Sequence, residues 1–216
     1  MINGQSPVFD TARKMMVDSQ LRPNKVTDDR LIGAFSMLTR ETFLPAALAS
    51  RAYADENIRL GNGRVMLAPM ALARLVQEAD ITAGMTVLLV GAGTGYSAAI
   101  LTSTGAKITA LESDADLART AQTNGVSLVH GALAEGWSAN APYDRIIIEG
   151  AVTNLPETLA AQLAEGGRIV MVQDRGPRIG VAVVGVKTAA GISFAPKFDC
   201  VASVLPGFAK EAAFVF

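Results

Sequence analysis

Cysteine and histidine are almost absent from this chain of 216 residues. The single cysteine, Cys200, excludes an intrachain disulfide and a zinc site built on several cysteines. The single histidine, His130, leaves only one candidate base for a Ser-His-Asp or Cys-His arrangement. We therefore expect no metal site, and we expect a protein that works in the reducing environment of the cytoplasm.

Long apolar runs and an excess of charge of one sign are also missing. No stretch approaches the ~20 apolar residues of a membrane helix, and residues 1–10 lack the basic-then-apolar pattern of a signal peptide. Nineteen Lys and Arg balance twenty Asp and Glu, for a net charge of -1, whereas a general nucleic-acid binder is usually markedly basic. We expect neither a membrane nor a nucleic acid as partner, and the oligomeric state stays open.

The chain contains enough apolar residues to form a hydrophobic core. Half of the residues are apolar, which excludes a disordered chain, and the length predicts one folded unit with one core. We divide the chain into residues 1–70, a mainly helical segment that ends in a substrate loop, and residues 71–216, a core of strands and helices. The two parts are expected to form a single structural unit.

Strands and helices alternate from Met85 onward. Short apolar strands are expected at 86–90, 107–111, 126–129, 144–148 and 168–172, with helices at 96–102, 114–122 and 155–163 between them. Two more strands, 181–187 and 198–205, follow without an intervening helix. The alternation predicts an α/β fold with a parallel sheet, and the last two strands predict an antiparallel edge. Before Met85 we expect helices, with a flexible turn at 61–63.

A glycine-rich turn follows the expected strand at 86–90. Gly91, Gly93 and Gly95 form the pattern G-x-G-x-G, and glycines let a backbone turn sharply and approach a ligand at the start of a helix. A dinucleotide fingerprint needs a glycine at position 96, where Tyr96 stands. The pattern favours an adenosyl cofactor without a pyrophosphate. A nicotinamide enzyme and a purely structural turn stay as alternatives.

Glu112 supplies the second half of this signal. It lies 21 residues after Gly91, at the end of the second expected strand. An acid at this place accepts hydrogen bonds from the ribose hydroxyls of a nucleotide cofactor. We therefore predict a cofactor site where the glycine turn and Glu112 meet.

These features belong to a longer resemblance to the protein-L-isoaspartate O-methyltransferase family, which covers most of the chain. The segments that carry it are 13–21, 29–31, R-E-T-F-L-P at 40–45, A-Y-A-D at 52–55, 63–69, 73–74, G-A-G-T-G-Y at 91–96, G-W at 136–137, A-P-Y-D-R-I-I at 141–147 and G-G-R at 166–168. No single segment is decisive, but their shared order and spacing are specific.

The resemblance implies a Rossmann-like class I methyltransferase sheet, mostly parallel with an antiparallel C-terminal edge. It implies S-adenosylmethionine as cofactor and carboxyl methyl transfer to isoaspartyl residues of peptides and proteins. Such a reaction needs little acid–base chemistry, since the acceptor carboxylate is already ionised, and it depends on holding nucleophile and methyl group in line. The implied cofactor contacts are Gly91, Gly93, Gly95, Tyr96, Glu112 and Ala132.

The sequence departs from the family pattern at its substrate loop. Val65, Leu67 and Ala68 stand where the family has Thr, Ser and Gln, so three polar side chains have become apolar. Each hydrogen bond lost from a charged acceptor is worth about 1.5–3 kcal/mol. No residue is assigned as catalytic; Arg64 is a candidate to meet the substrate carboxylate, as a guanidinium often does.

Two cofactor acids of the family are also replaced. Leu89 stands where an acid precedes the glycine turn, and Ala132 where the acid of a G-D-G motif is expected. Glu135 or Glu149 could supply a substitute carboxylate. We therefore expect a family member with a weakened or altered site. The alternatives are a catalytically silent relative that acts as a binding or scaffold protein, and a methyltransferase with a different acceptor.

Overall fold

The structure is a computed structural model that describes residues 7–176 and 179–209. A seven-stranded sheet forms its centre, in the order β5-β4-β3-β6-β7-β8-β9. The strands are β3 (Thr86–Val90), β4 (Lys107–Glu112), β5 (Val129–His130), β6 (Tyr143–Val152), β7 (Leu163–Gln173), β8 (Gly180–Thr188) and β9 (Gly191–Cys200). Pairing is parallel from β5 to β7 and antiparallel at β7–β8 and β8–β9. The predicted fold class is confirmed.

Both faces of the parallel part of the sheet are buried, as parallel sheets require. Successive residues of β3 point to opposite faces of the sheet. Leu89 belongs to a core shared with the N-terminal helices, and Leu88 belongs to a second core shared with Leu159, which lies in the helix at Glu157–Gln162. The helices of the sheet region are α3 (Pro69–Glu78), α4 (Tyr96–Thr102), α5 (Ala115–Thr123) and α6 (Glu157–Gln162). Short 3-10 turns, η5 (Leu133–Glu135) and η6 (Ser138–Asn140), follow β5.

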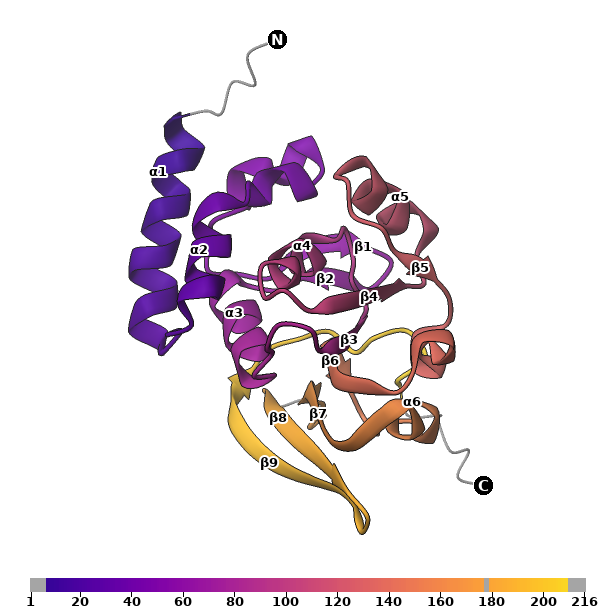
Figure 1. The fold of residues 1–216 in the computed structure, drawn as a ribbon. Helices are drawn as coiled ribbons and strands as arrows, with labels where there is room; N and C mark the ends of the chain where they lie inside the picture. The colour runs from indigo at the N-terminus through magenta and orange to yellow at the C-terminus, as the bar shows by residue number, and fades with distance from the viewer. Residues whose placement is uncertain (1–6, 177–178, 210–216) are drawn as a thin grey trace.

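The N-terminal segment lies against one side of the sheet region (Figure 1). Its elements are α1 (Pro7–Met16), a π-helical turn η1 (Val17–Leu21), the 3-10 turns η2 (Arg22–Asn24), η3 (Arg40–Phe43) and η4 (Ala46–Arg51), and α2 (Asp29–Met37). Asp28 caps α2 by accepting a hydrogen bond from the Arg30 N–H. The division of the chain at residue 70 stays a prediction.

Two short strands flank the turn that the sequence predicts at 61–63. β1 (Ile58–Gly61) and β2 (Arg64–Met66) form an antiparallel hairpin that is not hydrogen-bonded to the main sheet. Gly61, Asn62 and Gly63 form its tip, all with positive φ angles. The strands are too short for a period-two pattern to stand out, so the sequence reading found the tip and missed the strands.

The final strand also lies earlier than predicted. β9 ends at Cys200, whereas the sequence reading placed a strand at 198–205. Most of β9 is exposed, so it lacks the apolar pattern that the prediction used. The apolar segment that follows instead returns across the carboxyl end of β6: Ala151 N donates to Ser203 O at 2.9 Å, and Leu205 N donates to Ala151 O at 3.0 Å.

Among residues 7–176 and 179–209, no helix combines the length and the apolar character that crossing a bilayer requires. The same part of the chain contains no group of three or more His, Cys, Asp or Glu side chains arranged to hold a metal ion.

Candidate functional site

The glycine turn joins the end of β3 to the start of α4. Gly91, Gly93 and Gly95 all have positive φ angles, of 81°, 56° and 90°, which glycine adopts without the steric penalty of a side chain. The N–H groups of Gly91 and Ala92 donate to Leu111 O at 2.9 and 3.0 Å. These bonds hold the turn against the end of β4, where the carboxyl edge of an open sheet forms ligand sites.

Glu112 lies at this edge and is fully buried. Its Oε2 accepts from the N–H of Gly93 at 2.6 Å, while Oε1 accepts from the N–H groups of Ser113 at 2.8 Å and Asp114 at 3.0 Å. The structure therefore brings the predicted acid directly against the glycine turn. It also shows that backbone donors already bind both carboxylate oxygens.

Arg64 is a further donor to Glu112, beside a longer contact from the Ser113 hydroxyl at 3.4 Å. Its Nη2 lies 2.8 Å from Glu112 Oε2 and donates to Gly91 O at 2.8 Å, and the two side chains are 2% and 0% exposed. The Arg64 Nε and Nη1 atoms are buried without a hydrogen-bond partner. The sequence predicts that Arg64 meets a substrate carboxylate; in the structure its guanidinium binds Glu112, the acid predicted to contact the cofactor.

A second side chain covers the turn from the C-terminal segment. A Cβ atom placed on Gly91 would lie 3.1 Å from Arg64 Nη2 and 3.2 Å from Leu205 Cδ1. The space in front of Gly91 is thus filled by the ends of two side chains, which belong to the hairpin and to the segment after β9. The sequence reading missed Leu205, because the contact depends on how residues 201–208 return to the sheet.

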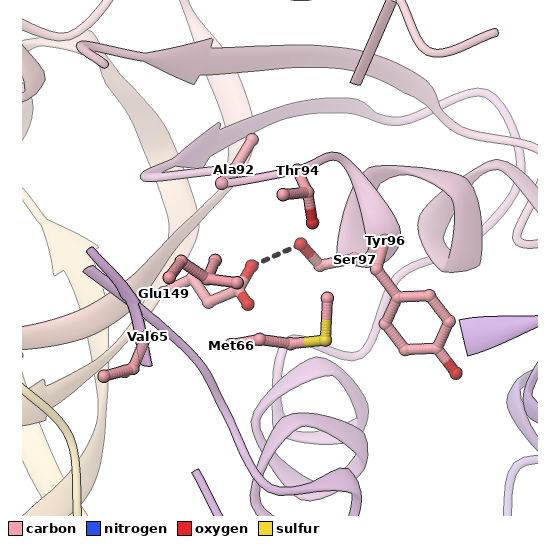
Figure 2. A pocket seen from close by; sticks show the side chains of 9 residues that line it. Val65, Met66, Ala92, Thr94, Tyr96, Ser97 and Glu149 are labelled. Carbon is pink, nitrogen blue, oxygen red and sulfur yellow. Dashed lines mark hydrogen bonds between the residues drawn. The ribbon is translucent and has the colours of Figure 1, made fainter. Parts of the chain in front are cut away.

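A small, mostly apolar cavity with a polar side lies beside the turn (Figure 2). Gly93, Thr94, Ser97 and Glu149 line it on the polar side, and its volume is about 10 Å³, which is close to the smallest space that holds one water molecule. The Ser97 hydroxyl donates to Glu149, and the two side chains face one another in Figure 2. The Thr94 hydroxyl is buried without a partner.

The carboxyl group of Glu149 has an unusual affinity for a proton. Burial raises its pKa from 4.5 to about 7, and this effect outweighs the opposing influence of the Ser97 hydrogen bond and of the positive charges on Arg64 and Arg40. Glu149 follows Ile148, which pairs with Val90 at the end of β3. It therefore lies next to the glycine turn, where a carboxylate could substitute for the acid replaced by Leu89.

Tyr96 begins α4, but its side chain points away from Glu149 and Ser97 (Figure 2). Its ring lies edge-on to Phe35 and Phe43, with centroids 6.0 and 5.3 Å away, and the guanidinium of Arg40 stacks over it at 4.9 Å. Burial raises the pKa of Tyr96 to about 12. The predicted cofactor contact at Tyr96 stays a prediction; its aromatic ring joins the N-terminal segment to α4.

The loop positions that the resemblance assigned to substrate lie partly inside the core. Leu67 is fully buried, and its carbonyl accepts from Arg40 Nη2 at 2.6 Å, while Val65 and Ala68 are partly exposed. Ala68 N donates to Asn57 Oδ1 at 2.8 Å. Within this loop, the side chains at 65, 67 and 68 carry no group that can donate a hydrogen bond to a substrate carboxylate.

The remaining predicted positions lie near the end of β5. Ala132 is exposed and follows Gly131, whose N–H donates to Glu112 O at 3.1 Å. His130 is exposed, and its Nε2 lies 3.0 Å from Ser113 O. Ala132 therefore lies close to Glu112 along the backbone, whereas Glu135 is exposed and in the following 3-10 turn.

Solved structures share this architecture. One, titled protein-L-isoaspartate O-methyltransferase, superposes with a TM-score of 0.77 at 24% identity, covering 90% of this chain and 66% of that one. Another, a putative protein-L-isoaspartate O-methyltransferase from Plasmodium falciparum in complex with S-adenosyl-L-homocysteine, gives 0.73 at 17% identity, covering 91% and 97%. With its sheet order, glycine turn and acid, the chain has the Rossmann-like fold of the methyltransferases.

The family assignment follows from the sequence comparisons. Residues 11–188 match the family Protein-L-isoaspartate(D-aspartate) O-methyltransferase (PCMT). The chain is 38% identical over 168 residues to the protein-L-isoaspartate O-methyltransferase of Methylorubrum populi, covering 75% of this chain and 79% of the relative. It is 36% identical over 170 residues to that of Koribacter versatilis, covering 76% and 77%. The chain belongs to the protein-L-isoaspartate O-methyltransferase family, as the resemblance implied.

Proposed function

We propose that this chain transfers the methyl group of S-adenosylmethionine to the free carboxylate of isoaspartyl residues in peptides and proteins. The observation that carries the proposal is the contact of Glu112 Oε2 with the N–H of Gly93, 2.6 Å apart. It puts a buried acid on a glycine turn at the carboxyl edge of the sheet, where nucleotide cofactors bind. Membership of the family and the activity for which its relatives are named support the choice of reaction.

The residues of the site have the chemical groups that an adenosyl cofactor needs. The turn at 91–95 exposes backbone without side chains, and Glu112 is the acceptor that ribose hydroxyls require. The atoms that stand before Gly91 are the ends of the Arg64 and Leu205 side chains rather than backbone. Movement of these two side chains, together with the hairpin and the C-terminal segment that carry them, would therefore open the space without a change in the main sheet.

The reaction requires the protein mainly to position the acceptor carboxylate and the methyl group of the cofactor. When bound, the cofactor supplies an electrophilic methyl group on a sulfonium ion. The isoaspartyl carboxylate is already ionised at neutral pH, so no side chain has to remove a proton from it. The work of this chain is to hold the two reactants in line and to exclude water. The exposed His130 is not needed as a base.

The partners and the place of action follow from the same reading. Isoaspartyl-bearing peptides and proteins are the proposed substrates, and the near-zero net charge gives no reason to add a nucleic acid. We place the activity in the cytoplasm, since one cysteine allows no disulfide framework. That residue, Cys200, is buried, and burial raises the pKa of its thiol to about 11.

Two observations favour a second candidate, a silent relative that binds partners without methylating them. Glu112 is already bound by Arg64 and by three backbone N–H groups, and the loop side chains Val65, Leu67 and Ala68 cannot bind an acceptor carboxylate. The same apolar loop also suits an acceptor that carries less charge. These candidates share the fold and differ in their reaction.

The test is methyl transfer from radiolabelled S-adenosylmethionine to a synthetic isoaspartyl peptide, with the matched aspartyl peptide as control. Label in the isoaspartyl peptide alone is the expected result. Label in neither peptide, together with no heat of S-adenosylmethionine binding, would favour the silent relative. Binding heat without transfer to the isoaspartyl peptide would favour a different acceptor.

A further inference from the structure

Glu112 has no free position for another donor. A carboxylate offers about four acceptor positions, and here they are taken by Arg64 and by the N–H groups of Gly93, Ser113 and Asp114, with the Ser113 hydroxyl as a longer fifth contact at 3.4 Å. The three N–H groups belong to the turn and to the start of α5, so they are fixed by the fold. Arg64 is the one donor that comes from a separate element, the β1–β2 hairpin.

Arg64 is held in this position by an incomplete set of contacts. Its Nη2 has two partners, Glu112 and Gly91 O, while Nε and Nη1 are buried with none. A buried donor without a partner destabilises the conformation that contains it. Movement of Arg64 to a more hydrated position would satisfy the two unpaired nitrogens, which makes this contact weaker than a fully bonded buried arginine.

The tip of the hairpin, residues 61–63, is exposed and has both a tether and space to move, whereas Ile58 and Met66 at its base are buried. Asn62 Nδ2 donates to Asp114 Oδ2 at 2.8 Å, so the tip is tied to the residue that caps α5. A surface hollow of about 340 Å³ lies on the hairpin, lined in part by Arg59, Arg64 and Ser203. β1 and β2 form a sheet of their own, so lifting the hairpin breaks no strand pairing with the main sheet.

We propose that Arg64 competes with the cofactor for Glu112, so that the β1–β2 hairpin is a cover which S-adenosylmethionine must displace. The proposal rests on the cofactor part of the proposed function. Arg64 binds Glu112 Oε2, an oxygen that the ribose hydroxyls would also use, and the guanidinium occupies the space in front of Gly91. The cofactor affinity of this chain is therefore set by a contact within its own fold.

The experiment is calorimetric titration of S-adenosylmethionine and S-adenosylhomocysteine into the wild type and Arg64→Met, which keeps an unbranched apolar stem without the guanidinium. We expect Arg64→Met to bind both compounds at least tenfold more tightly. The matched control is Arg59→Met, which removes an exposed arginine of the same hairpin and should leave the affinity unchanged.

Amide hydrogen exchange over residues 58–66 gives a readout that does not depend on activity. Addition of S-adenosylmethionine to the wild type should accelerate exchange of the hairpin, and Arg64→Met should show the faster exchange without any ligand. Should Arg64→Met fail to fold, Asn62→Ala replaces it, since it releases the second tether; it should raise both the exchange rate and the affinity, by at least twofold.

The outcomes separate the two proposals. Binding by the wild type with equal or weaker binding by Arg64→Met would overturn the competition and leave the proposed function intact. Absence of binding in both proteins would overturn the cofactor-dependent function, and the competition with it, because removal of Arg64 would then have opened no site. Hairpin exchange that is unchanged in Arg64→Met, or in Asn62→Ala where that variant replaces it, would also overturn the cover.

Discussion

Arg64 Nη2 and Glu112 Oε2 lie 2.8 Å apart in an ion pair whose two side chains are almost completely buried. Removal of one partner from a buried pair typically destabilises a protein by about 3–5 kcal/mol. We expect Glu112→Ala to have an effect of this size, because Arg64 would keep only the Gly91 carbonyl. Arg64→Met should have a smaller effect, since Glu112 keeps its three backbone donors. Urea unfolding of both variants measures the difference, and equal losses would contradict this assignment of contacts.

Glu149 should make the stability depend on pH. Its pKa is raised from 4.5 to about 7 in the folded protein, so the folded state binds a proton more tightly than the unfolded state. Its contribution to stability is therefore largest below pH 4.5 and is lost as the pH rises through 7. The neighbouring charged groups are Arg64, Arg40 and Glu112, and Ser97 donates to the carboxylate.

The Glu149→Gln variant removes this titration and keeps a partner for Ser97. It should unfold at a higher urea concentration than the wild type at pH 8, with a much smaller difference at pH 4. Urea midpoints at a series of pH values test this directly. Parallel curves for the two proteins across the range would show that Glu149 titrates normally.

Arg40 is a second buried arginine, and it joins the loop at Leu67 to the N-terminal segment. Its Nε donates to Ala52 O at 2.7 Å and its Nη2 to Leu67 O at 2.6 Å. Lysine cannot reproduce this planar, divergent pair of bonds. Arg40→Lys should therefore lower the free energy of unfolding by about 2–4 kcal/mol, from two hydrogen bonds to a charged group. Arg22→Lys, at an exposed pair of 3.7 Å, is the control and should change little; similar losses in both would contradict the role of Arg40.

The loop positions 65 and 67 should respond differently to the hydroxyl residues that the family has there. Leu67 is fully buried, so Leu67→Ser leaves a cavity and a hydroxyl in the core and should destabilise by about 2–5 kcal/mol. Val65 is partly exposed and borders the small cavity near Glu149, so Val65→Thr should change stability by less than about 1 kcal/mol. Thermal unfolding compares the two, and a tolerated serine at 67 would mean that this loop is open to solvent.

The sequence predicted most of the sheet region because its signals are local. The strand at Thr86–Val90 and the helix at Tyr96–Thr102 are confirmed with the predicted bounds, since a buried parallel strand is apolar throughout and glycines mark its end. The exposed edge strand β9 was misplaced for the opposite reason. It contains Ser193, Pro196 and Lys197, and polar residues and proline are typical of an edge that avoids further pairing.

The candidate site was predictable only in part. The meeting of Glu112 with the glycine turn follows from the spacing of two adjacent parallel strands, which the sequence displays. The partner of Glu112 does not follow, because Arg64 is 48 residues away along the chain and reaches it from a hairpin that has no clear pattern. Leu205 lies on a segment whose path across β6 depends on tertiary packing alone.

A crystal structure of the chain with S-adenosylhomocysteine would test the central claim most directly. We expect the adenosyl group to lie over residues 91–95, its ribose hydroxyls to bind Glu112, and the Arg64 guanidinium to have left the space before Gly91. Crystals grown at millimolar ligand in which Arg64 still binds Glu112, and no adenosyl group lies against the turn, would contradict it.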